Sequence, residues 1–364
     1  MKIMTILGTR PEIIRLSLIL KKLDRIASKH IVVHTGQNFT ASLNDIFFKE
    51  MDIRKPDYVL STREHSLGQQ LSLMFRELEI LFNNEKPDKV LILGDTNSAL
   101  SAILAERMNI PVYHMEAGNR CNDLRVPEEK NRKTVDAISM YNLPYTPKSR
   151  ENLLREGVPS KRIMMSGNPI YEVLDFYKDD INKSTILKKM NLNSSDYFLT
   201  TIHRAENVDN PENLKLILEA INLIAATFKK RVVCSVHPRT RSKINALDSL
   251  NLDPLIELEE PFGFFDFVQL EKNAVCVLTD SGTVQEECCL YRVPTVTVRN
   301  TTERPETVEC GSNVVTGLQP ENILNAVNVM ITQQRNWEFP TGYADSNVSD
   351  KVVKFLIGGN ESVE

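Results

Sequence analysis

The sequence predicts an α/β fold built from two parallel-sheet domains. Short runs of aliphatic and β-branched residues alternate with amphipathic segments of helical periodicity, which is the pattern of repeated strand–helix units. The chain has 364 residues, and at roughly 100–200 residues per domain two domains are expected. Polar residues directly follow most of the predicted strands, and open parallel sheets bind ligands at the carboxyl ends of their strands.

The composition is that of an ordinary globular protein. Hydrophobic residues make up 41% of the chain and charged residues 25%, and each half is long enough to bury its own core. The net charge of −4 gives no support for a nucleic-acid partner, which usually meets a basic face. No run approaches the roughly 18 apolar residues of a membrane span, and the first residues do not resemble a secretory signal. We therefore expect a cytoplasmic protein that binds neither nucleic acid nor membrane.

The cysteines agree with this expectation. The chain has six cysteines, and no two of them form a CxxC pair. Structural zinc sites usually need such closely spaced ligands, so we expect no metal site. Disulfides are rare in the cytoplasm, and we expect reduced thiols.

The first half of the chain contains the elements of one sheet. A helix is expected from Pro11, because proline suits the first helical turn, where its missing N–H has no helical partner. Ser66 and Gln69 have the spacing of a capping box, and apolar residues follow them at helical intervals. Strands are expected over residues 2–7, 31–34, 89–93 and 112–115.

The second half repeats this organisation without a visible sequence repeat. A helix is expected from Pro211, with apolar residues on one face. The segment before this half, residues 174–195, is polar and rich in Lys, Asp, Asn and Ser, and we interpret it as the domain junction. Strands are expected over residues 197–202, 232–236, 274–279 and 295–298.

Two strand-to-helix turns have the features of anion sites. In Gly8-Thr9-Arg10-Pro11-Glu12, a helix start offers free N–H groups, Arg10 adds a forked cation, and Arg15 lies one turn further on. The second turn has a small Ser-Gly pair at a helix start, which lets backbone amides approach a diphosphate. An ordinary capped helix start explains either turn equally well. The candidate residues of the second turn are Ser281, Gly282, Thr283 and, further along the helix, Glu287.

Three carboxylates are candidates for acid/base chemistry: Asp95, Glu116 and Glu128. Asp95 and Glu116 follow predicted strands. Removing a proton from a carbon and returning one from the other face needs two positioned groups, and clustered carboxylates acquire the different pKa values that such work requires. For each one alone, a helix cap or a surface ion pair is the more ordinary interpretation.

Two histidines are candidates for function because they stand at strand ends beside basic residues. His203 precedes Arg204, and His237 precedes Pro238-Arg239. His114 lies inside a predicted strand and is interpreted as structural, while His30 and His65 are interpreted as incidental. An aromatic cluster is assigned mainly to the core, although one ring is a candidate to flank a uracil base; it comprises Phe262, Phe264, Phe265 and Phe267.

Taken in order, these motifs resemble those of the non-hydrolysing UDP-N-acetylglucosamine 2-epimerases. The match extends from residue 1 to about residue 330, and the ordered set is specific although each piece is weak. The motifs are GTRPE (8–12), GDT (94–96), EAG (116–118), PEE and NR (127–129 and 131–132), HRAEN (203–207), VHPR (236–239), DSG…QEE (280–287) and TTERPE (301–306).

The resemblance implies a GT-B-like α/β fold of two Rossmann-type parallel-sheet domains with an interdomain cleft. The first domain would comprise residues 1–173 plus a crossing helix at about 349–364, and the second, UDP-binding domain residues 174–348. The implied reaction eliminates UDP in the anti sense to a 2-acetamidoglycal and adds it back in the syn sense, which inverts C2 without a cofactor or metal. A homodimer that supplies surface-polysaccharide precursors is also implied.

The resemblance also assigns roles to individual residues. The catalytic positions are matched by Asp95, Glu116, Glu128 and His203. The UDP-contacting positions are matched by Arg10, Ser281, Gly282, Glu287, His237 and Arg304, and Gln37 is expected near the nucleotide.

Three departures bear on the sugar that is used. The usual LRTGD after EAG is NRCND here (119–123), the usual lysine of the first helix is Arg15, and the second Gly of DSGG is Thr283. EAGNRC with NRKTVDAIS (131–139) is similar to a subgroup that forms UDP-N-acetyl-L-fucosamine from its C2 epimer. UDP-GlcNAc/UDP-ManNAc and a 6-deoxy analogue therefore both remain candidate substrates.

Other functions share parts of this pattern. A GT-B glycosyltransferase uses the same fold and a UDP-sugar donor, so the fold alone does not decide; it needs an acceptor groove rather than carboxylates around C2. A catalytically inactive sugar-nucleotide sensor does not need the acid/base positions, which are all filled here. A hydrolysing epimerase releases free sugar and UDP, and analysis of the products distinguishes it.

Overall fold

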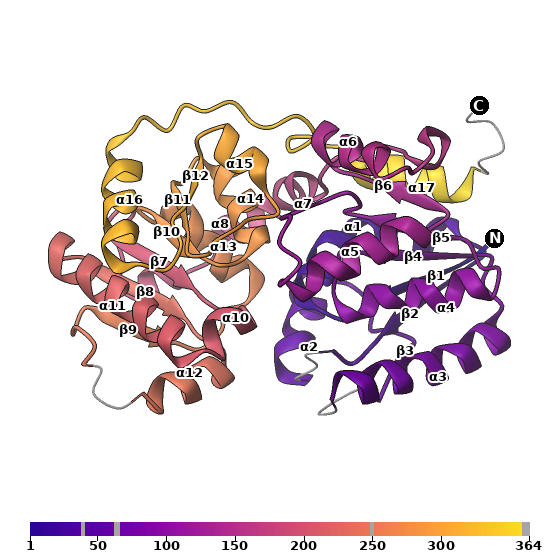
Figure 1. The fold of residues 1–364 in the computed structure, drawn as a ribbon, viewed down its shortest axis with the longest axis horizontal. Helices are drawn as coiled ribbons and strands as arrows, with labels where there is room; N and C mark the ends of the chain where they lie inside the picture. Colours follow the sequence, from indigo (N-terminus) through magenta and orange to yellow (C-terminus); the bar gives the residue numbers. More distant parts are fainter. Residues whose placement is uncertain (38–40, 62–65, 248–250, 359–364) are drawn as a thin grey trace. The chain divides into compact units, whose positions relative to one another are not determined.

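The computed structural model describes residues 1–37, 41–61, 66–247 and 251–358, without the side chains of residues 41–45 (Figure 1). The chain divides into two compact units. Unit 1 comprises Met1–Phe176 together with Thr341–Glu364, and unit 2 comprises Tyr177–Pro340. Each unit is an α/β body with its own sheet, so each is described by itself.

The described part of unit 1 contains one sheet of six parallel strands in the order β3-β2-β1-β4-β5-β6. Strand β1 pairs with β2 on one side and β4 on the other, and β4 pairs in turn with β5. Strands β1, β4 and β5 are almost entirely buried, as expected of a parallel sheet covered by helices on both faces. The strands are β1 (Lys2–Leu7), β2 (Lys29–His34), β3 (Tyr58–Val59), β4 (Lys89–Leu93), β5 (Val112–Met115) and β6 (Tyr141–Leu143).

Local sequence explains where the helices of unit 1 begin. Helix α1 starts at Arg10 with Pro11 in its first turn, as expected. Ser66 and Gln69 form the expected capping box of α3, with Ser66 N donating to Gln69 Oε1 at 3.1 Å. The helices are α1 (Arg10–Ile26), α2 (Ala41–Glu50), α3 (Leu67–Glu85), η1 (Asn97–Leu100), α4 (Ser101–Arg107), α5 (Pro127–Ile138), α6 (Pro147–Arg155), η2 (Ser160–Arg162), α7 (Ile170–Phe176) and α17 (Val348–Ile357).

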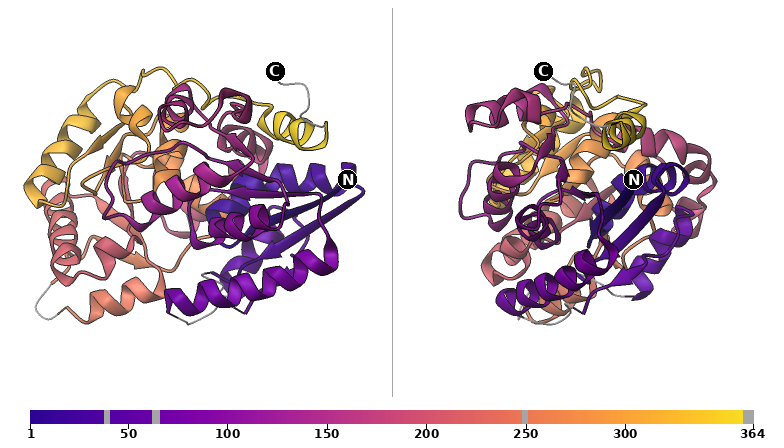
Figure 2. Two further views of the ribbon diagram at one scale, coloured as in Figure 1. Left: turned by 45° about the vertical axis from the view of Figure 1, so that its right-hand side comes forward. Right: turned by 90° about the vertical axis from the view of Figure 1, so that its right-hand side faces the viewer.

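Helix α17 belongs to unit 1 although it follows unit 2 in the sequence. It packs on α1 and is the yellow helix near the C-terminus in Figure 2. Polar contacts hold the first turn of α17: Ser349 N donates to Glu172 Oε2 at 2.7 Å, and Lys22 Nζ pairs with Asp350 Oδ1 at 2.5 Å. Of the range predicted for this helix, residues 359–364 lie outside the described part of the chain.

The described part of unit 2 repeats the topology of unit 1. Its sheet has six parallel strands in the order β12-β11-β10-β7-β8-β9, which is the same winding read from the other edge. The strands are β7 (Tyr197–Thr201), β8 (Arg231–Ser235), β9 (Ile256–Glu259), β10 (Val277–Thr279), β11 (Thr295–Thr297) and β12 (Asn313–Val315).

The helices of unit 2 cover both faces of this sheet (Figure 1). They are α8 (Lys178–Lys183), α9 (Ile186–Lys189), α10 (Ala205–Val208), α11 (Pro211–Phe228), α12 (Pro238–Asn245), α13 (Phe264–Asn273), α14 (Gly282–Tyr291), α15 (Pro305–Glu309) and α16 (Pro320–Thr332). No helix in either unit, over the residues that the structure describes, is long and apolar enough to cross a membrane.

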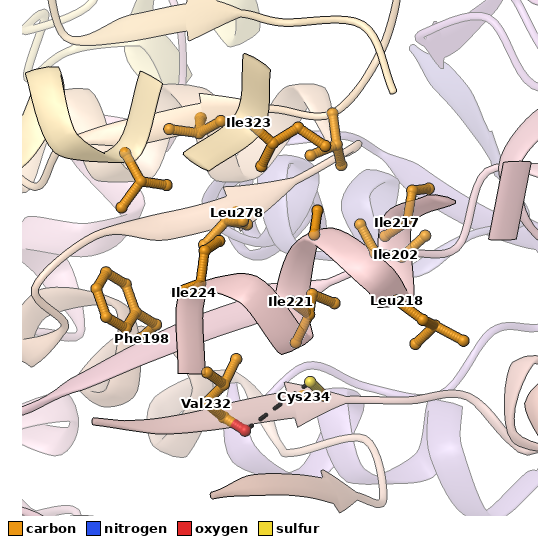
Figure 3. Close-up of a cluster of buried hydrophobic side chains, with 14 of the residues drawn as sticks. Phe198, Ile202, Ile217, Leu218, Ile221, Ile224, Val232, Cys234, Leu278 and Ile323 are labelled. Carbon is orange, nitrogen blue, oxygen red and sulfur yellow. Dashed lines mark hydrogen bonds between the residues drawn. The ribbon is translucent and has the colours of Figure 1, made fainter. Parts of the chain in front are cut away.

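The core of unit 2 shows why the apolar face of α11 is needed. Figure 3 shows Ile217, Ile221 and Ile224 on the face of α11 that packs against side chains of the sheet. Those side chains include Phe198, Val232, Cys234 and Leu278, and Ile323 of α16 joins them. Burial of such side chains contributes about 1.5–3 kcal/mol each, so this contact holds α11 and, through it, the loops at its ends.

The strand that precedes α14 was predicted too long. The sequence indicated a strand over 274–279, but β10 begins at Val277. Ala274 instead forms the C-terminal cap of α13, so the helix ends where the strand was expected to start. A short apolar run after a helix does not by itself show where the helix ends.

The strand order reverses at one point in each sheet, between β1 and β4 in unit 1 and between β7 and β10 in unit 2. In doubly wound sheets ligands bind outside the carboxyl ends of the strands at this point. The residues that follow β1, β4, β7 and β10 therefore lie where a ligand is expected to bind.

The buried face of α11 can be tested by mutation. Ile221→Ala removes a side chain that is 2% exposed, and we expect unit 2 to lose about 2–5 kcal/mol of stability. The chain's single tryptophan, Trp337, lies in unit 2, so its fluorescence during urea denaturation follows this unit. Leu223→Ala, at a 37% exposed position of the same helix, should change stability by about 0.5 kcal/mol or less. Equal urea midpoints for the two variants would contradict the packing.

Candidate functional site

The loops after β1, β2 and β4 converge at the carboxyl edge of the unit 1 sheet. A Cβ atom on Gly8 would overlap Thr35 Oγ1 and Ser98 Oγ and lie 3.4 Å from Gln37 Cβ. Only glycine allows this approach, and it brings Gln37 beside the turn that precedes Arg10. Arg10 is half-buried, and its guanidinium lies 5.7 Å from the ring centre of Phe47.

Glu12 joins the first of these loops to the third. Its carboxylate accepts hydrogen bonds from Gly8 N at 2.5 Å, Thr9 N at 3.1 Å and Thr96 Oγ1 at 2.7 Å. Burial raises the pKa of Glu12 to about 7, although these three bonds oppose the shift. Sequence analysis treated Glu12 only as part of the GTRPE motif and missed this role.

Glu116 follows β5 in an unusual backbone conformation. Its φ of 67° lies in the left-handed region, which costs a residue other than glycine about 1–3 kcal/mol and is found mostly at functional sites. The Arg15 guanidinium donates to Glu116 Oε2, and both side chains are buried. Sequence analysis assigned Arg15 to an anion; the structure pairs it with a candidate catalytic carboxylate.

Asp95 follows β4 and is held by a buried arginine that sequence analysis did not select. Arg132, 2% exposed, approaches Asp95 Oδ2 with Nε at 2.7 Å and Nη2 at 2.5 Å. Its Nη1 donates to Glu129 Oε2 at 2.8 Å. Arg132 is the arginine of the NR motif already noted, and its i,i+3 spacing from Glu129 was the available signal.

Glu129 is fully buried and anchors the segment before α5. Its carboxylate accepts from Cys121 N at 3.0 Å and Asn122 N at 3.1 Å, in addition to Arg132. Burial raises the pKa of Glu129, but the hydrogen bonds and the arginine outweigh it, and the net pKa is lowered. Cys121, one of the departures from the family pattern, thus lies against this carboxylate, with its Sγ 3.4 Å from Glu129 Oε2.

Glu128 lies in the first turn of α5 and is half-buried. Asn131 and Arg132 are three and four residues further on, so they share a helix face with Glu128. Both contact Asp95, with Asn131 Nδ2 donating to the Asp95 carbonyl at 2.9 Å. This face brings Glu128 to the neighbourhood of Asp95.

In unit 2, Asp280 organises the loop that carries His203. Asp280 is fully buried after β10, and it accepts from His203 N at 3.1 Å, Arg204 N at 2.9 Å and Asn207 Nδ2 at 3.0 Å. The His203 ring remains about half exposed, with Nδ1 3.2 Å from Asp280 Oδ1. Asp280 therefore fixes the backbone and one ring nitrogen of His203, a role not foreseen from the DSG motif.

The start of α14 is closely packed against the 301–306 segment. A Cβ atom on Gly282 would lie 2.6 Å from Glu303 Oε1 and 3.4 Å from Arg304 Cζ, so a larger residue here would displace the Glu303 carboxylate. Ser281 is the N-cap, yet its side chain makes no capping hydrogen bond to any described residue. The helix start carries a partial positive charge, and Thr283 lies half-buried in its first turn.

Buried ion pairs hold this segment in place. Glu303 accepts from Arg204 Nη2 and from Arg299 Nη1, each at 2.8 Å. Arg304 Nε donates to Glu286 Oε1, and both of these side chains are buried. The structure thus pairs Arg304, a predicted UDP contact, with a carboxylate of α14.

The two remaining predicted residues of unit 2 lie on different elements. Glu287 is buried on α14 beside Glu271 of α13, and burial together with Glu287 raises the pKa of Glu271 well above its ordinary value. His237 is the N-cap of α12, with Nδ1 accepting from Arg239 N at 3.3 Å. Within the described parts of the chain, no group of three or more His, Cys, Asp or Glu is placed to hold a metal ion.

The fold and these side chains define a class of protein. Each unit has the strand order of a Rossmann-type domain, and most of the predicted residues follow a strand or lie at the start of the next helix. Residues 21–357 match the family model described as UDP-N-acetylglucosamine 2-epimerase, and the chain belongs to that family.

Two relatives and one solved structure are similar along nearly the whole chain. The UDP-N-acetylglucosamine 2-epimerase of Methanocaldococcus jannaschii is 41% identical, over 99% of this chain and 100% of the relative. A Pseudomonas aeruginosa UDP-2,3-diacetamido-2,3-dideoxy-D-glucuronate 2-epimerase is 36% identical, over 97% and 100%. A crystal structure of the M. jannaschii enzyme with UDP-GlcNAc and UDP has a TM-score of 0.93 at 40% identity, covering 99% of this chain and 100% of that one. The predicted family and the GT-B-like α/β fold are confirmed.

The buried carboxyl of Glu12 gives a pH-dependent contribution to stability. Its pKa rises from 4.5 in the unfolded chain to about 7 when folded, so between these values the folded protein binds more protons and stability falls as pH rises. At about 1.36 kcal/mol per unit, the loss by pH 8 is on the order of 3 kcal/mol.

Glu12→Gln mimics the protonated form, because the amide oxygen accepts from Gly8 and Thr9 and the amide nitrogen donates to Thr96. We expect the variant to gain stability relative to the wild type as pH rises from 5 to 8. Thermal unfolding followed by circular dichroism measures this difference. The other titrating groups are the same in both proteins, so their contributions to stability cancel. Parallel curves for the two proteins would show that Glu12 does not titrate in this range.

Proposed function

We propose that this protein inverts C2 of a UDP-N-acetylhexosamine by eliminating UDP and adding it back. One observation carries the proposal: two carboxylates, Asp95 and Glu116, follow the adjacent strands β4 and β5, and each is held by a buried arginine. The arginines orient the two carboxylates, and a general base must be held in position beside the proton that it removes. Membership of the epimerase family supports the same reaction.

The reaction needs one proton removed and one returned. A carboxylate takes the C2 proton, the C–H electron pair forms the C1–C2 double bond, and the C1–O bond breaks with its electrons leaving on UDP. A second group then delivers a proton to the opposite face of C2 while UDP re-adds at C1. We propose Asp95, Glu116 and Glu128 for the proton transfers, with His203 as the fourth catalytic group.

Unit 2 supplies the features that suit a UDP leaving group. The start of α14, at Ser281, Gly282 and Thr283, offers backbone N–H groups to a diphosphate. Glu287 on the same helix is proposed to contact the ribose. The remaining proposed nucleotide contacts are Arg10, Arg15, Gln37, His237 and Arg304.

The catalytic set is therefore divided between the two units, and we propose that both act on one bound substrate in an interdomain cleft. The division proposed from the sequence, residues 1–173 with 349–364 and residues 174–348, assigns the carboxylates to one part and His203 with the α14 turn to the other. Enclosing the glycal between two parts keeps it from escaping and strengthens the interactions that stabilise the leaving UDP.

The relatives and the sequence motifs indicate different sugars. UDP-GlcNAc/UDP-ManNAc is the pair favoured by the M. jannaschii relative, whereas the P. aeruginosa relative is named for a diacetamido-glucuronate. The NRC segment at 119–121 keeps the 6-deoxy substrate of the fucosamine subgroup as a candidate. We propose a role in surface-polysaccharide precursor synthesis in each case.

We also propose a cytoplasmic homodimer. All six cysteines lie in described parts of the chain and are free thiols, which suits a reducing compartment. The dimer rests on the family resemblance, and light scattering on the eluting protein measures its mass directly.

Epimerisation predicts exchange of the C2 hydrogen with solvent. Incubated in D₂O with UDP-GlcNAc and no acceptor, the protein should incorporate deuterium at C2 and produce the UDP-linked epimer, observed by NMR. The same assay with a UDP-6-deoxy-N-acetylhexosamine decides between the candidate sugars. Release of free sugar would instead identify a hydrolysing epimerase, and no exchange with any member of the panel would overturn the proposal.

A shared site predicts that single changes in either unit stop the same reaction. Asp95→Asn in unit 1 and His203→Asn in unit 2 should each lower kcat by about 100-fold or more, since each removes a proposed catalytic group. UDP affinity, measured by calorimetry, should stay within about threefold for Asp95→Asn. Lys243→Gln, at an exposed position of α12, serves as a surface control. If either catalytic variant keeps full turnover, the two units do not act on one sugar as proposed.

A further inference from the structure

His114 was interpreted as structural because it lies within a strand. Its side chain also contacts residues of two other segments. It lies in β5 two residues before Glu116 and is 1% exposed. Its Nδ1 lies 2.8 Å from Asp136 Oδ1, and its Nε2 lies 2.7 Å from the carbonyl oxygen of Gly94. It therefore connects β5 to α5 and to the residue before Asp95.

Both partners require the ring to donate. A backbone carbonyl has no proton to give, so Nε2 carries one. Asp136 Oδ2 already accepts from Gly118 N at 3.0 Å and from Arg120 Nη2 at 2.7 Å, as expected of an ionised carboxylate. With Asp136 as a carboxylate, Nδ1 donates as well, and this hydrogen-bond pattern is that of an imidazolium cation.

His30 in the same sheet shows the opposite arrangement. Its Nδ1 also meets a carboxylate, Asp24, at 2.6 Å, but its Nε2 meets the hydroxyl of Thr5 at 2.9 Å. A hydroxyl can donate, so the His30 ring satisfies both contacts while neutral. Burial lowers the pKa of His30, and Asp24 offsets this only in part.

Two carboxylates near His114 favour its cation: Asp136 from α5 and Glu116 beyond the end of β5. The Gly94 carbonyl faces the ring from the end of β4, and β6 contributes the uncharged Asn142 alongside. Arg120 pairs with Asp136 and Arg15 pairs with Glu116, and the positive charge of these arginines opposes the cation. Burial lowers the pKa of His114, but the Asp136 hydrogen bond and charge, the Gly94 carbonyl and Glu116 together outweigh it and raise the net pKa.

The contacts of His114 join two turns of the proposed active site. On one side the ring holds the Gly94 carbonyl, which precedes Asp95. On the other side it orients Asp136, whose second oxygen holds the Gly118 amide two residues after Glu116. A shift of the ring moves both turns together, and reacting groups displaced by about 1 Å lose rate by as much as about 100-fold.

We propose that His114 is a positioning residue, held as a buried imidazolium, that sets Asp95 and Glu116 at the spacing required for proton transfer at C2. As an imidazolium, the ring donates to the Gly94 carbonyl and to the Asp136 carboxylate at the same time. A neutral tautomer has only one N–H and can donate to only one of them. The kinetic part of this inference rests on the proposed function; the protonation state does not.

The protonation state is tested on the full-length wild-type chain labelled with ¹⁵N-histidine. Long-range ¹H–¹⁵N spectra at pH 8 should show two protonated nitrogens for His114 and one for His30, with the signals assigned from His114→Gln and, if that variant does not fold, from His30→Gln and Asp136→Asn. One unprotonated nitrogen on His114 at pH 8 would overturn the proposal.

Kinetics test the positioning role. His114→Gln and Asp136→Asn should each lower kcat about 10- to 100-fold with KM for the UDP-sugar and UDP affinity changed by no more than about threefold. His30→Gln, equally buried in the same sheet, should keep wild-type kcat. Unchanged kcat in a folded His114→Gln protein would refute the positioning role, as would an equal loss in His30→Gln. If the wild-type protein shows no C2 exchange, the proposed function is refuted. The NMR spectra then still decide whether His114 is an imidazolium.

Discussion

The carboxylates at the end of the unit 1 sheet are tolerated only because each is matched by donors. Glu12, Glu116, Glu129 and Asp136 are all buried, and an isolated buried carboxylate is costly enough to be protonated instead. Arginines and backbone amides neutralise three of them, and at Asp136 the imidazole of His114 joins Arg120 and the Gly118 amide. Among the described residues, Glu12 accepts from two amides and a hydroxyl, and burial raises its pKa to about 7.

Buried carboxyl groups in unit 2 also need hydrogen-bond partners, and there they fix the position of loops. Asp280 has no arginine among the contacts described above, and it is satisfied by the amides of the His203 loop, so the position of that loop follows from the need to satisfy a buried charge. Glu303 and Glu286 bind Arg204, Arg299 and Arg304 around the start of α14. The cations near the proposed diphosphate site are thus held in place before any ligand arrives, which reduces the entropy lost on binding.

The fold was predictable because its signals are local. The buried central strands read as continuous apolar runs, and capping residues such as Pro11 and Ser66 mark the helix starts. Four edge strands were missed because they have only two to four residues and do not form longer apolar runs. They are β3, β6, β9 and β12. Among site residues, the candidates that follow strands were found from the sequence. The importance of Arg132 and the hydrogen-bonding roles of Asp280 and His114 were not, since their partners lie 37, 77 and 20–22 positions away. Such pairings depend on the tertiary fold and leave no periodic trace.

The discontinuity of unit 1 has a consequence for how the chain reaches its native state during translation. The ribosome releases the strands of the first sheet early, but α17, which covers α1, emerges only after all of Tyr177–Pro340 has been made. Unit 2 is one continuous segment, so its synthesis is complete before that of unit 1. The apolar surface that α17 shields, against Val352, Val353 and Leu356, stays open for that interval. The nascent chain is consequently most exposed to aggregation through its oldest part, and a chaperone that binds apolar segments has its substrate there.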